Sequence, residues 1–167
     1  MDGSQKPTGP VAIESVPWSE FSEGVRFALR YRVLSNTREH GRKIGVSYEE
    51  LPPGKQSVPF HYHLVEEEHI VALEGECTLR LGDERYTLRA GDYVCFPAGQ
   101  RAGHCLINET SKPFRFIMIG DHDPNEVAVY PDSNKILIRG LDRAILRDEN
   151  RLPYTDGERA DEPVNQN

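Results

Sequence analysis

The amino-acid sequence predicts an all-β domain built as a barrel or a sandwich. Between about Val25 and Ile138, short segments in which apolar and polar residues alternate follow one another, and this is the pattern of half-buried strands. Clusters of Gly, Pro, Asp and Asn separate these segments roughly every eight to twelve residues, a spacing typical of antiparallel sheets. The helical period of 3.6 residues is nearly absent. A chain of 167 residues fits one ordinary domain with a core of its own.

Eleven segments carry the strand pattern, the last two of them weakly. They are residues 26–34, 44–51, 58–63, 69–74, 77–81, 85–88, 93–96, 104–107, 114–119, 127–130 and 135–138. The residues outside this region are rich in Pro, Asp, Glu, Gly and Asn and offer few apolar anchors, so they resemble arms or tails more than parts of a core. We therefore expect an N-terminal arm over residues 1–24, a barrel over 25–140 and a C-terminal tail over 141–167.

Composition excludes several classes of partner. The chain has 27 acidic and 20 basic side chains, a net charge of -7, and no run of Lys and Arg that would attract nucleic acid or an anionic membrane surface. It lacks the basic start and apolar stretch of a secretory signal and any segment apolar enough to span a bilayer. We expect a cytoplasmic protein whose partner is a small molecule. The three cysteines, without a CxxC pair, are expected to be buried, reduced thiols.

The segment HYHLVEEE carries the chemistry of the chain. His61 and His63 lie two residues apart in a strand-like run, so their imidazoles project from one face about 7 Å apart along the strand. A turn after His63 can bring a glutamate beside them, and spacing alone leaves Glu66, Glu67 and Glu68 as alternatives. Imidazole nitrogen with carboxylate oxygen suits a first-row transition metal better than Ca²⁺ or Mg²⁺, which prefer oxygen ligands.

Two segments resemble the motifs of the cupin superfamily. Residues 54–75, GKQSVPFHYHLVEEEHIVALEG, are similar to the first cupin motif, and in that register the acidic ligand falls on Glu68, upstream of Gly75. Residues 91–108, GDYVCFPAGQRAGHCLIN, are similar to the second motif, which supplies His104 as a fourth ligand. Four residues separate Gly99 from His104 where two are usual. This longer loop is typical of a cupin subset that is often labelled, by analogy, sugar-phosphate isomerase.

The resemblance implies a cupin jelly-roll β-barrel, or double-stranded β-helix, with extended terminal arms. It implies one divalent transition-metal ion per chain, zinc, iron, manganese or nickel, held inside one mouth of the barrel by His61, His63, Glu68 and His104. It also implies a homodimer. The expected function is that of a metal-dependent cupin acting on a small organic acid or sugar derivative, as an isomerase or a dioxygenase. The alternative is a metal-dependent module that binds or senses a small molecule without turnover.

Other polar side chains have less certain places. His69 follows Glu68 on a strand and should point to the opposite face, as a packing or surface residue. Gln100 and Arg101 lie in the lengthened loop before His104, where an Arg either grips the carboxylate or phosphate of a ligand or remains an exposed surface residue. No recognisable nucleophile triad, phosphate loop or acid and base pair predicts a particular reaction.

Overall fold

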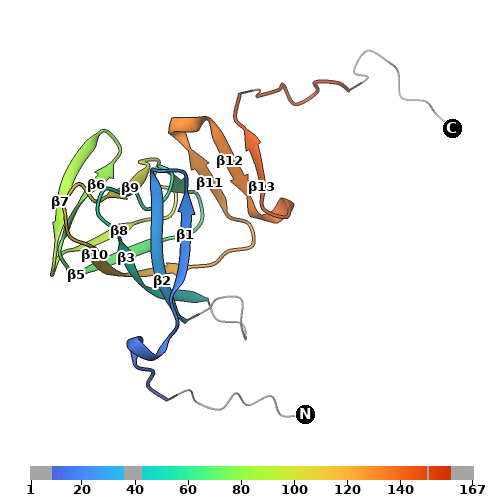
Figure 1. The fold of residues 1–167 in the computed structure, drawn as a ribbon. Coiled ribbons are helices and arrows are strands. Elements are labelled where there is room, and N and C mark those ends of the chain that lie inside the picture. The colour runs from blue at the N-terminus through green and yellow to red at the C-terminus, as the bar shows by residue number, and fades with distance from the viewer. Residues whose placement is uncertain (1–8, 36–42, 150, 159–167) are drawn as a thin grey trace, which may run out of the picture.

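A computed structural model describes residues 9–35, 43–149 and 151–158, and its regular secondary structure consists almost entirely of strands (Figure 1). The strands are β1 (Ser19–Glu23), β2 (Phe27–Ser35), β3 (Ile44–Leu51), β4 (Tyr62–His63), β5 (Glu68–Glu74), β6 (Glu76–Leu81), β7 (Glu84–Arg89), β8 (Tyr93–Phe96), β9 (His104–Ile107), β10 (Phe114–Asp121), β11 (Val127–Tyr130), β12 (Lys135–Ile138) and β13 (Ala144–Arg147). Three 3₁₀ turns, η1 (Ile13–Ser15), η2 (Pro131–Ser133) and η3 (Arg139–Leu141), are the helical elements of the described residues. None of them approaches the length of a membrane-spanning helix. The all-β prediction is confirmed.

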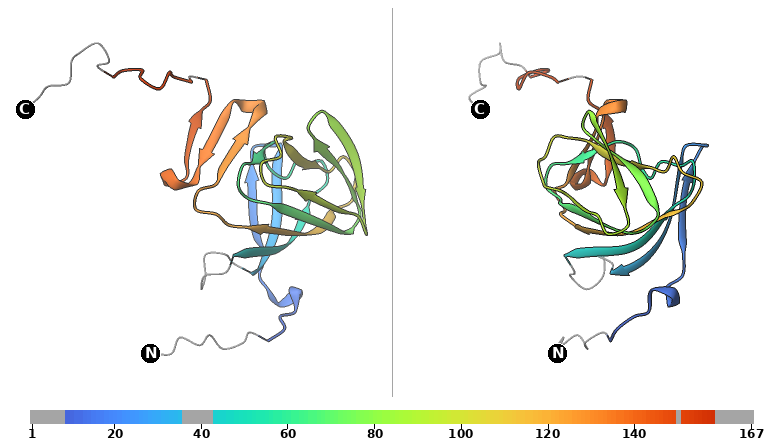
Figure 2. Two further views of the ribbon diagram at one scale, coloured as in Figure 1. Left: turned by 180° about the vertical axis from the view of Figure 1, so that it is seen from behind. Right: turned by 90° about the vertical axis from the view of Figure 1, so that its left-hand side faces the viewer.

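Two antiparallel sheets enclose the core. One has six strands in the order β1-β2-β3-β10-β5-β8, and the other has three in the order β7-β6-β9. The inner faces of the two sheets pack together in a single apolar cluster. The first sheet contributes Ile70 of β5 and Phe114 and Phe116 of β10, and the second contributes Leu79 of β6 and Leu106 of β9. Figure 2 shows the closed, barrel-like outline that results.

A third sheet, β13-β12-β11-β4, stands beside one end of the barrel, and its strands β11, β12 and β13 are drawn in orange in Figure 1. It joins the barrel through β4, since Ala128 of β11 pairs with His63 and Val129 pairs with Tyr62. We refer to β11, β12 and β13 as the terminal sheet. Its attachment point lies within the HYH segment, so the terminal sheet borders the predicted metal site.

The sequence reading differs from the structure at three strands. β1 lies within residues 1–24 and β13 within residues 141–167, where only an arm and a tail were expected. Both are edge strands whose side chains are almost all exposed, so they are held by backbone hydrogen bonds and leave little apolar alternation to detect. The strand expected over residues 58–63 is reduced to β4 and a one-residue bridge at His61, because Pro59 cannot donate to a ladder.

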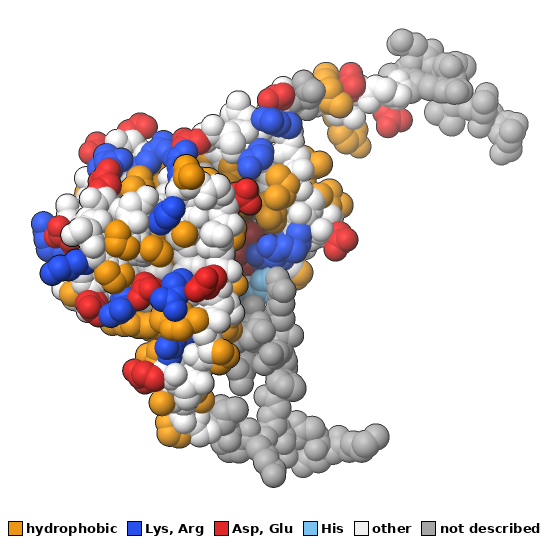
Figure 3. Space-filling view, in the orientation of Figure 1, with side chains coloured by type: hydrophobic (Ala, Val, Ile, Leu, Met, Phe, Trp, Pro, Cys, Tyr) orange, Lys and Arg blue, Asp and Glu red, His pale blue; other side chains and the backbone are white. Residues whose placement is uncertain are grey.

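Charged side chains of both signs are mixed on one face of the barrel. Figure 3 shows Lys and Arg interspersed with Asp and Glu over the face of the barrel seen in Figure 1. Several form cross-strand ion pairs, such as Arg115 with Glu50 and Glu74. This arrangement agrees with the absence of a basic patch in the sequence.

Gly75, between β5 and β6, provides a test of the turn geometry. Its φ is +78°, and a Cβ atom there would lie 2.7 Å from the backbone oxygen of Pro113. Gly75→Ala is expected to lower the free energy of unfolding by about 3 kcal/mol, since backbone strain adds to a contact with atoms that cannot turn away. Gly54→Ala is the matched control: its φ is +70° with nothing within 4 Å, and it should cost only about 1 kcal/mol. Equal losses in urea unfolding would contradict the proposed contact.

Candidate metal centre

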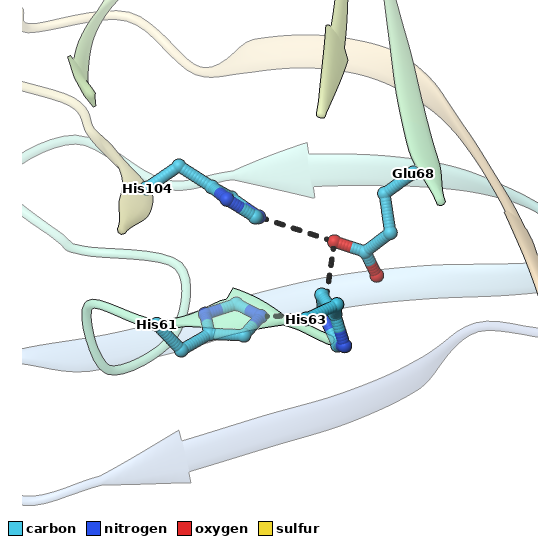
Figure 4. Close-up of side chains that lie close together, drawn as sticks. All are labelled: His61, His63, Glu68 and His104. Carbon is cyan, nitrogen blue, oxygen red and sulfur yellow. Dashed lines mark hydrogen bonds and ion pairs between the residues drawn. The ribbon is translucent and has the colours of Figure 1, made fainter. Parts of the chain in front are cut away.

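The structure brings His61, His63, Glu68 and His104 together, and one donor atom from each lies within 4.8 Å of the others. Figure 4 shows the four side chains converging. Glu68 Oε2 lies 3.2 Å from His104 Nε2 and 3.5 Å from His63 Nε2, and the Nε2 atoms of His61 and His63 are 3.0 Å apart. The four residues come from separate elements: the bridge before β4, β4 itself, the start of β5 and the start of β9.

Backbone hydrogen bonds fix the positions of the main chain at three of the predicted ligand residues. His61 N donates to His104 O at 3.2 Å and His104 N donates to His61 O at 2.7 Å, so two predicted ligands face each other across an antiparallel bridge. Gly99 N donates to His63 O at 3.0 Å. The lengthened loop before His104 therefore supports the backbone of a ligand residue.

The hydrogen bonds at the Nδ1 atoms show that the donor set fits a metal ion. His61 Nδ1 lies 2.9 Å from the carbonyl oxygen of Pro59, and His63 Nδ1 lies 3.0 Å from a carboxylate oxygen of Glu126. Both partners only accept, so in the neutral rings each Nδ1 carries the hydrogen and each Nε2 presents a lone pair. Two lone pairs 3.0 Å apart repel unless a proton or a metal ion lies between them. Three imidazoles and one carboxylate are the donors that a first-row transition metal prefers.

The ionisation of the cluster agrees with a site that favours bound cations. Burial is the largest cause that lowers the pKa of His61 to about 4, and the neighbouring His104 acts in the same direction. Burial acts against protonation of His63 as well, but hydrogen bonds and negative charge from Glu68 and Glu126 prevail and raise its pKa to about 9. Burial would raise the pKa of Glu68, yet hydrogen bonds from His104 and His63 hold it well below its ordinary value. Glu68 is therefore a carboxylate at any physiological pH.

Glu126, directly before β11, holds the turn of residues 64–66, which connects His63 to Glu68 and is called the ligand loop below. Its side chain is fully buried and accepts hydrogen bonds from the backbone N–H groups of Leu64, Val65 and Glu66 at 3.2, 3.0 and 2.7 Å, besides its contact with His63. One carboxylate thus orients a ligand imidazole and holds the turn that brings Glu68 to the site. The sequence reading missed this residue, because it lies 63 positions after His63 and outside any local motif.

The three consecutive glutamates are separated by the structure. Glu68 faces the cluster, whereas Glu66 is buried beside it and pairs with Arg139. Glu67 points to the outer surface, where its carboxylate lies 3.0 Å from His69 Nε2. The alternation of a strand explains why Glu68 faces inward while its neighbours Glu67 and His69 both face outward.

A cavity of about 360 Å³ ends on three of the four predicted ligands, His61, Glu68 and His104. The barrel contributes apolar walls through Leu29, Ile70, Phe116 and Met118, and the terminal sheet contributes Tyr130, Lys135 and Ile145. The ring of Tyr130 stacks on His61 with 5.7 Å between centroids, and Lys135 Nζ lies 5.4 Å from the Tyr130 ring. The cavity is large enough for a small organic molecule.

Glu49 of β3 is a buried carboxyl on the wall of the same cavity, 8% exposed. Burial raises its pKa to about 7, although the Ser47 hydroxyl donates to it at 2.6 Å and acts in the opposite direction. The negative charge of Glu68 contributes to this rise of the pKa. The sequence reading did not single out Glu49. The available signal was alternation in β3, which places Ser47 and Glu49 on the same face as the buried Leu51.

Glu49→Gln is expected to change the pH dependence of stability. The folded pKa of Glu49 lies near 7, above its ordinary value of 4.5, so wild-type stability falls as the pH rises between these values and the unfolded chain ionises first. The neutral amide avoids this loss. In urea unfolding of the metal-free proteins, the variant should gain up to about 3 kcal/mol on the wild type between pH 4.5 and pH 8. A difference that does not change with pH would show that Glu49 ionises normally.

Gln100 and Arg101 of the sequence reading, and two arginines of β2, lie away from the cavity. Gln100 and Arg101 are exposed and are not among the residues that line it. Arg30 and Arg32 lie on the outside of the six-stranded sheet, with their guanidinium carbons 4.6 and 4.4 Å from the ring of Trp18. The candidate site therefore contains no arginine among its lining residues, and Lys135 is the cation that the described residues place on its wall.

Residues 47–120 match the family model of the cupin domain. This region contains all four predicted ligands and both motifs. The chain carries a cupin domain. The sheets described above are accordingly those of a cupin jelly roll.

Known proteins that resemble this cupin differ in their names. It is 32% identical over 102 residues to quercetin 2,3-dioxygenase of Bacillus subtilis (strain 168), a match that spans 59% of this chain but only 30% of the length of that protein. A sugar phosphate isomerase from the cupin superfamily of Silicibacter pomeroyi superposes with a TM-score of 0.74 at 24% identity, over 87% of this chain and 98% of that one. A candidate sugar phosphate isomerase of Acidithiobacillus ferrooxidans gives a TM-score of 0.66 at 27% identity, over 74% and 81% of the two chains.

Proposed function

We propose that this cupin is a metal-dependent enzyme that acts on a small organic acid or sugar derivative. The observation that carries the proposal is the presence of the buried Glu49 carboxyl on the wall of the cavity that ends at the metal-ligand cluster. A module that only binds a ligand needs the metal alone. A second group that exchanges protons near neutral pH is what an acid–base reaction requires.

Each part of the cavity has a role in this proposal. A divalent transition metal held by His61, His63, Glu68 and His104 would supply Lewis-acid polarisation of a carbonyl or hydroxyl oxygen. Glu49 accepts a proton from the substrate and returns it. The ammonium of Lys135 binds a carboxylate or phosphate from the terminal-sheet side, as such anions prefer a charged donor. Apolar side chains of the barrel exclude water from the remaining wall.

The names of the similar proteins support this class of substrate. One is a dioxygenase and two are described as sugar phosphate isomerases, so both reaction types belong in a screen. Protein loaded with Fe²⁺, Mn²⁺, Zn²⁺ or Ni²⁺ should be assayed with sugar phosphates, diketones, oxalate and catechols. We expect metal-dependent turnover of one class, absent in His61→Ala and lowered roughly 10²- to 10⁴-fold in kcat in Glu49→Gln.

Two outcomes would contradict the proposal. Turnover that is unchanged in Glu49→Gln would remove the role assigned to this carboxyl. Flat rates with every compound, together with thermal stabilisation by one of them, would instead favour a metal-dependent module that binds a small molecule without converting it.

A further inference from the structure

We propose a second metal site on the outer face of the barrel, formed by Glu67, His69 and Cys95. One donor atom of each residue lies within 4.8 Å of the other two. These residues are separate from the cluster of His61, His63, Glu68 and His104, which we call the inner site. Neither His69 nor Cys95 has a role in the proposed function. Their donors are a carboxylate oxygen, an imidazole nitrogen and a thiol sulfur.

Strand geometry explains why the three side chains meet. Glu67 and His69 flank the inward-facing Glu68 on the chain, so both point outward. Cys95 of β8 is the direct cross-strand partner of His69, and Glu68 pairs with Phe96 in the same ladder. Side chains directly opposite one another on two antiparallel strands lie about 5 Å apart at Cβ. The register that places Glu68 inside therefore places a His and a Cys together outside.

The imidazole of His69 is already oriented for a ligand role. Its Nδ1 lies 2.8 Å from the hydroxyl of Tyr93, and the two rings stack with 5.9 Å between centroids and 20° between planes. Its Nε2 lies 3.0 Å from Glu67 Oε1, a separation that two ligands of one ion can adopt. A partner that binds one ring nitrogen and directs the other toward the metal is typical of ligand histidines.

The backbone of Glu67 is held by two hydrogen bonds, and its side chain lies beside a hollow. Glu67 N donates to Asp121 Oδ1 at 2.8 Å, and Asp121 N donates to Glu67 O at 3.3 Å. A hollow of about 180 Å³ adjoins Glu67 and His69 and extends to Ile44 and Gly120. It leaves room for water to complete the coordination of an ion that has three protein ligands.

The ligand types indicate which ion would bind. A thiolate, an imidazole and a carboxylate together suit Zn²⁺, and Co²⁺ as its spectroscopic substitute, better than Mg²⁺ or Ca²⁺. The inner site has no sulfur ligand. A thiolate-to-cobalt charge-transfer band therefore reports on the outer site alone, which separates the two sites in one experiment.

The test titrates metal-free full-length protein with Co²⁺ and follows the near-ultraviolet charge-transfer band, with bound metal counted by elemental analysis. We expect the band in the wild type and in His61→Ala, its loss in Cys95→Ala, and at least a tenfold weaker titration in His69→Ala. Bound cobalt should fall by one equivalent per chain in Cys95→Ala. Cys77→Ala is the matched control, because Cys77 is buried on the inner side of β6 and should leave the band unchanged.

Three results would overturn the second site: a wild type without the band, a band that persists in Cys95→Ala, or a band that disappears in His61→Ala. The near-ultraviolet circular dichroism of each variant shows whether it has folded. If Cys95→Ala does not fold, Glu67→Gln replaces it, with the same loss of one equivalent expected. Because none of these readouts uses turnover, a failure here leaves the proposed enzymatic function untouched, and the reverse also holds.

Discussion

Glu68→Gln is expected to weaken Zn²⁺ binding at the inner site by on the order of 100-fold or more. The glutamine has the same shape and keeps an oxygen donor, but the negative charge that lies 3.2 Å from His104 Nε2 and 3.5 Å from His63 Nε2 is lost. Loss of an anionic ligand should cost more than the 10- to 100-fold typical of residues that merely orient ligands. Competition with a chromogenic chelator, in a Cys95→Ala background that silences the outer residues, measures the change.

Glu67→Gln is the matched control for this prediction. It makes the same chemical change at the neighbouring position, on the side chain that faces His69, and the affinity of the inner site should stay within about twofold of the background protein. Equal weakening by both variants would mean that net charge, and not ligation by Glu68, determines the binding of the ion.

Glu126→Ala is expected to be among the most destabilising single changes in the chain, lowering the free energy of unfolding by about 4 kcal/mol. Three backbone N–H groups lose their common acceptor, and the buried side chain leaves a cavity. His63 also loses the partner of its Nδ1, so Zn²⁺ affinity should fall by about 10- to 100-fold in the protein that still folds. Urea unfolding and chelator competition give the two values.

Two further variants separate the causes in Glu126→Ala. Glu126→Gln keeps the volume but turns an NH₂ group toward donors, so it should still lose much of the stability. Glu109→Ala removes an exposed carboxylate that pairs with Arg85 and should change stability by less than about 1 kcal/mol. If Glu126→Ala were as mild as Glu109→Ala, the hydrogen bonds to residues 64–66 would not support the ligand loop.

The grouping of His61, His63, Glu68 and His104 could be predicted, because the residue spacings that indicate it are local in the sequence. His61 and His63 share a face by strand alternation alone, and the distance to Gly75 in the cupin motif distinguishes Glu68 from its two neighbours. Glu49 and Glu126 were missed for a physical reason: an isolated Glu in a strand or loop resembles a solvated one until its burial is known. β1 and β13 were missed because edge strands with exposed side chains carry no burial pattern.

The loop around Gln100 and Arg101 shows a further limit of sequence reasoning. Its length left open whether Arg101 binds a ligand or remains an exposed surface residue; in the structure Gln100 and Arg101 are exposed, and the backbone of Gly99 supports His63. A backbone hydrogen bond is independent of side-chain identity. Residue types in such a loop therefore say little about its role.

The predicted metal ligands and the terminal-sheet wall of the cavity come from different parts of the chain. The match to the cupin family model ends at residue 120, and the four predicted ligands all lie before that boundary. Tyr130, Lys135 and Ile145 of that wall all lie beyond this boundary. Mutations in β11, β12 and β13 can therefore alter which molecule enters while the ligand cluster stays constant. Such an arrangement would allow the molecule bound in the cavity to change in evolution while the four predicted metal ligands stay the same.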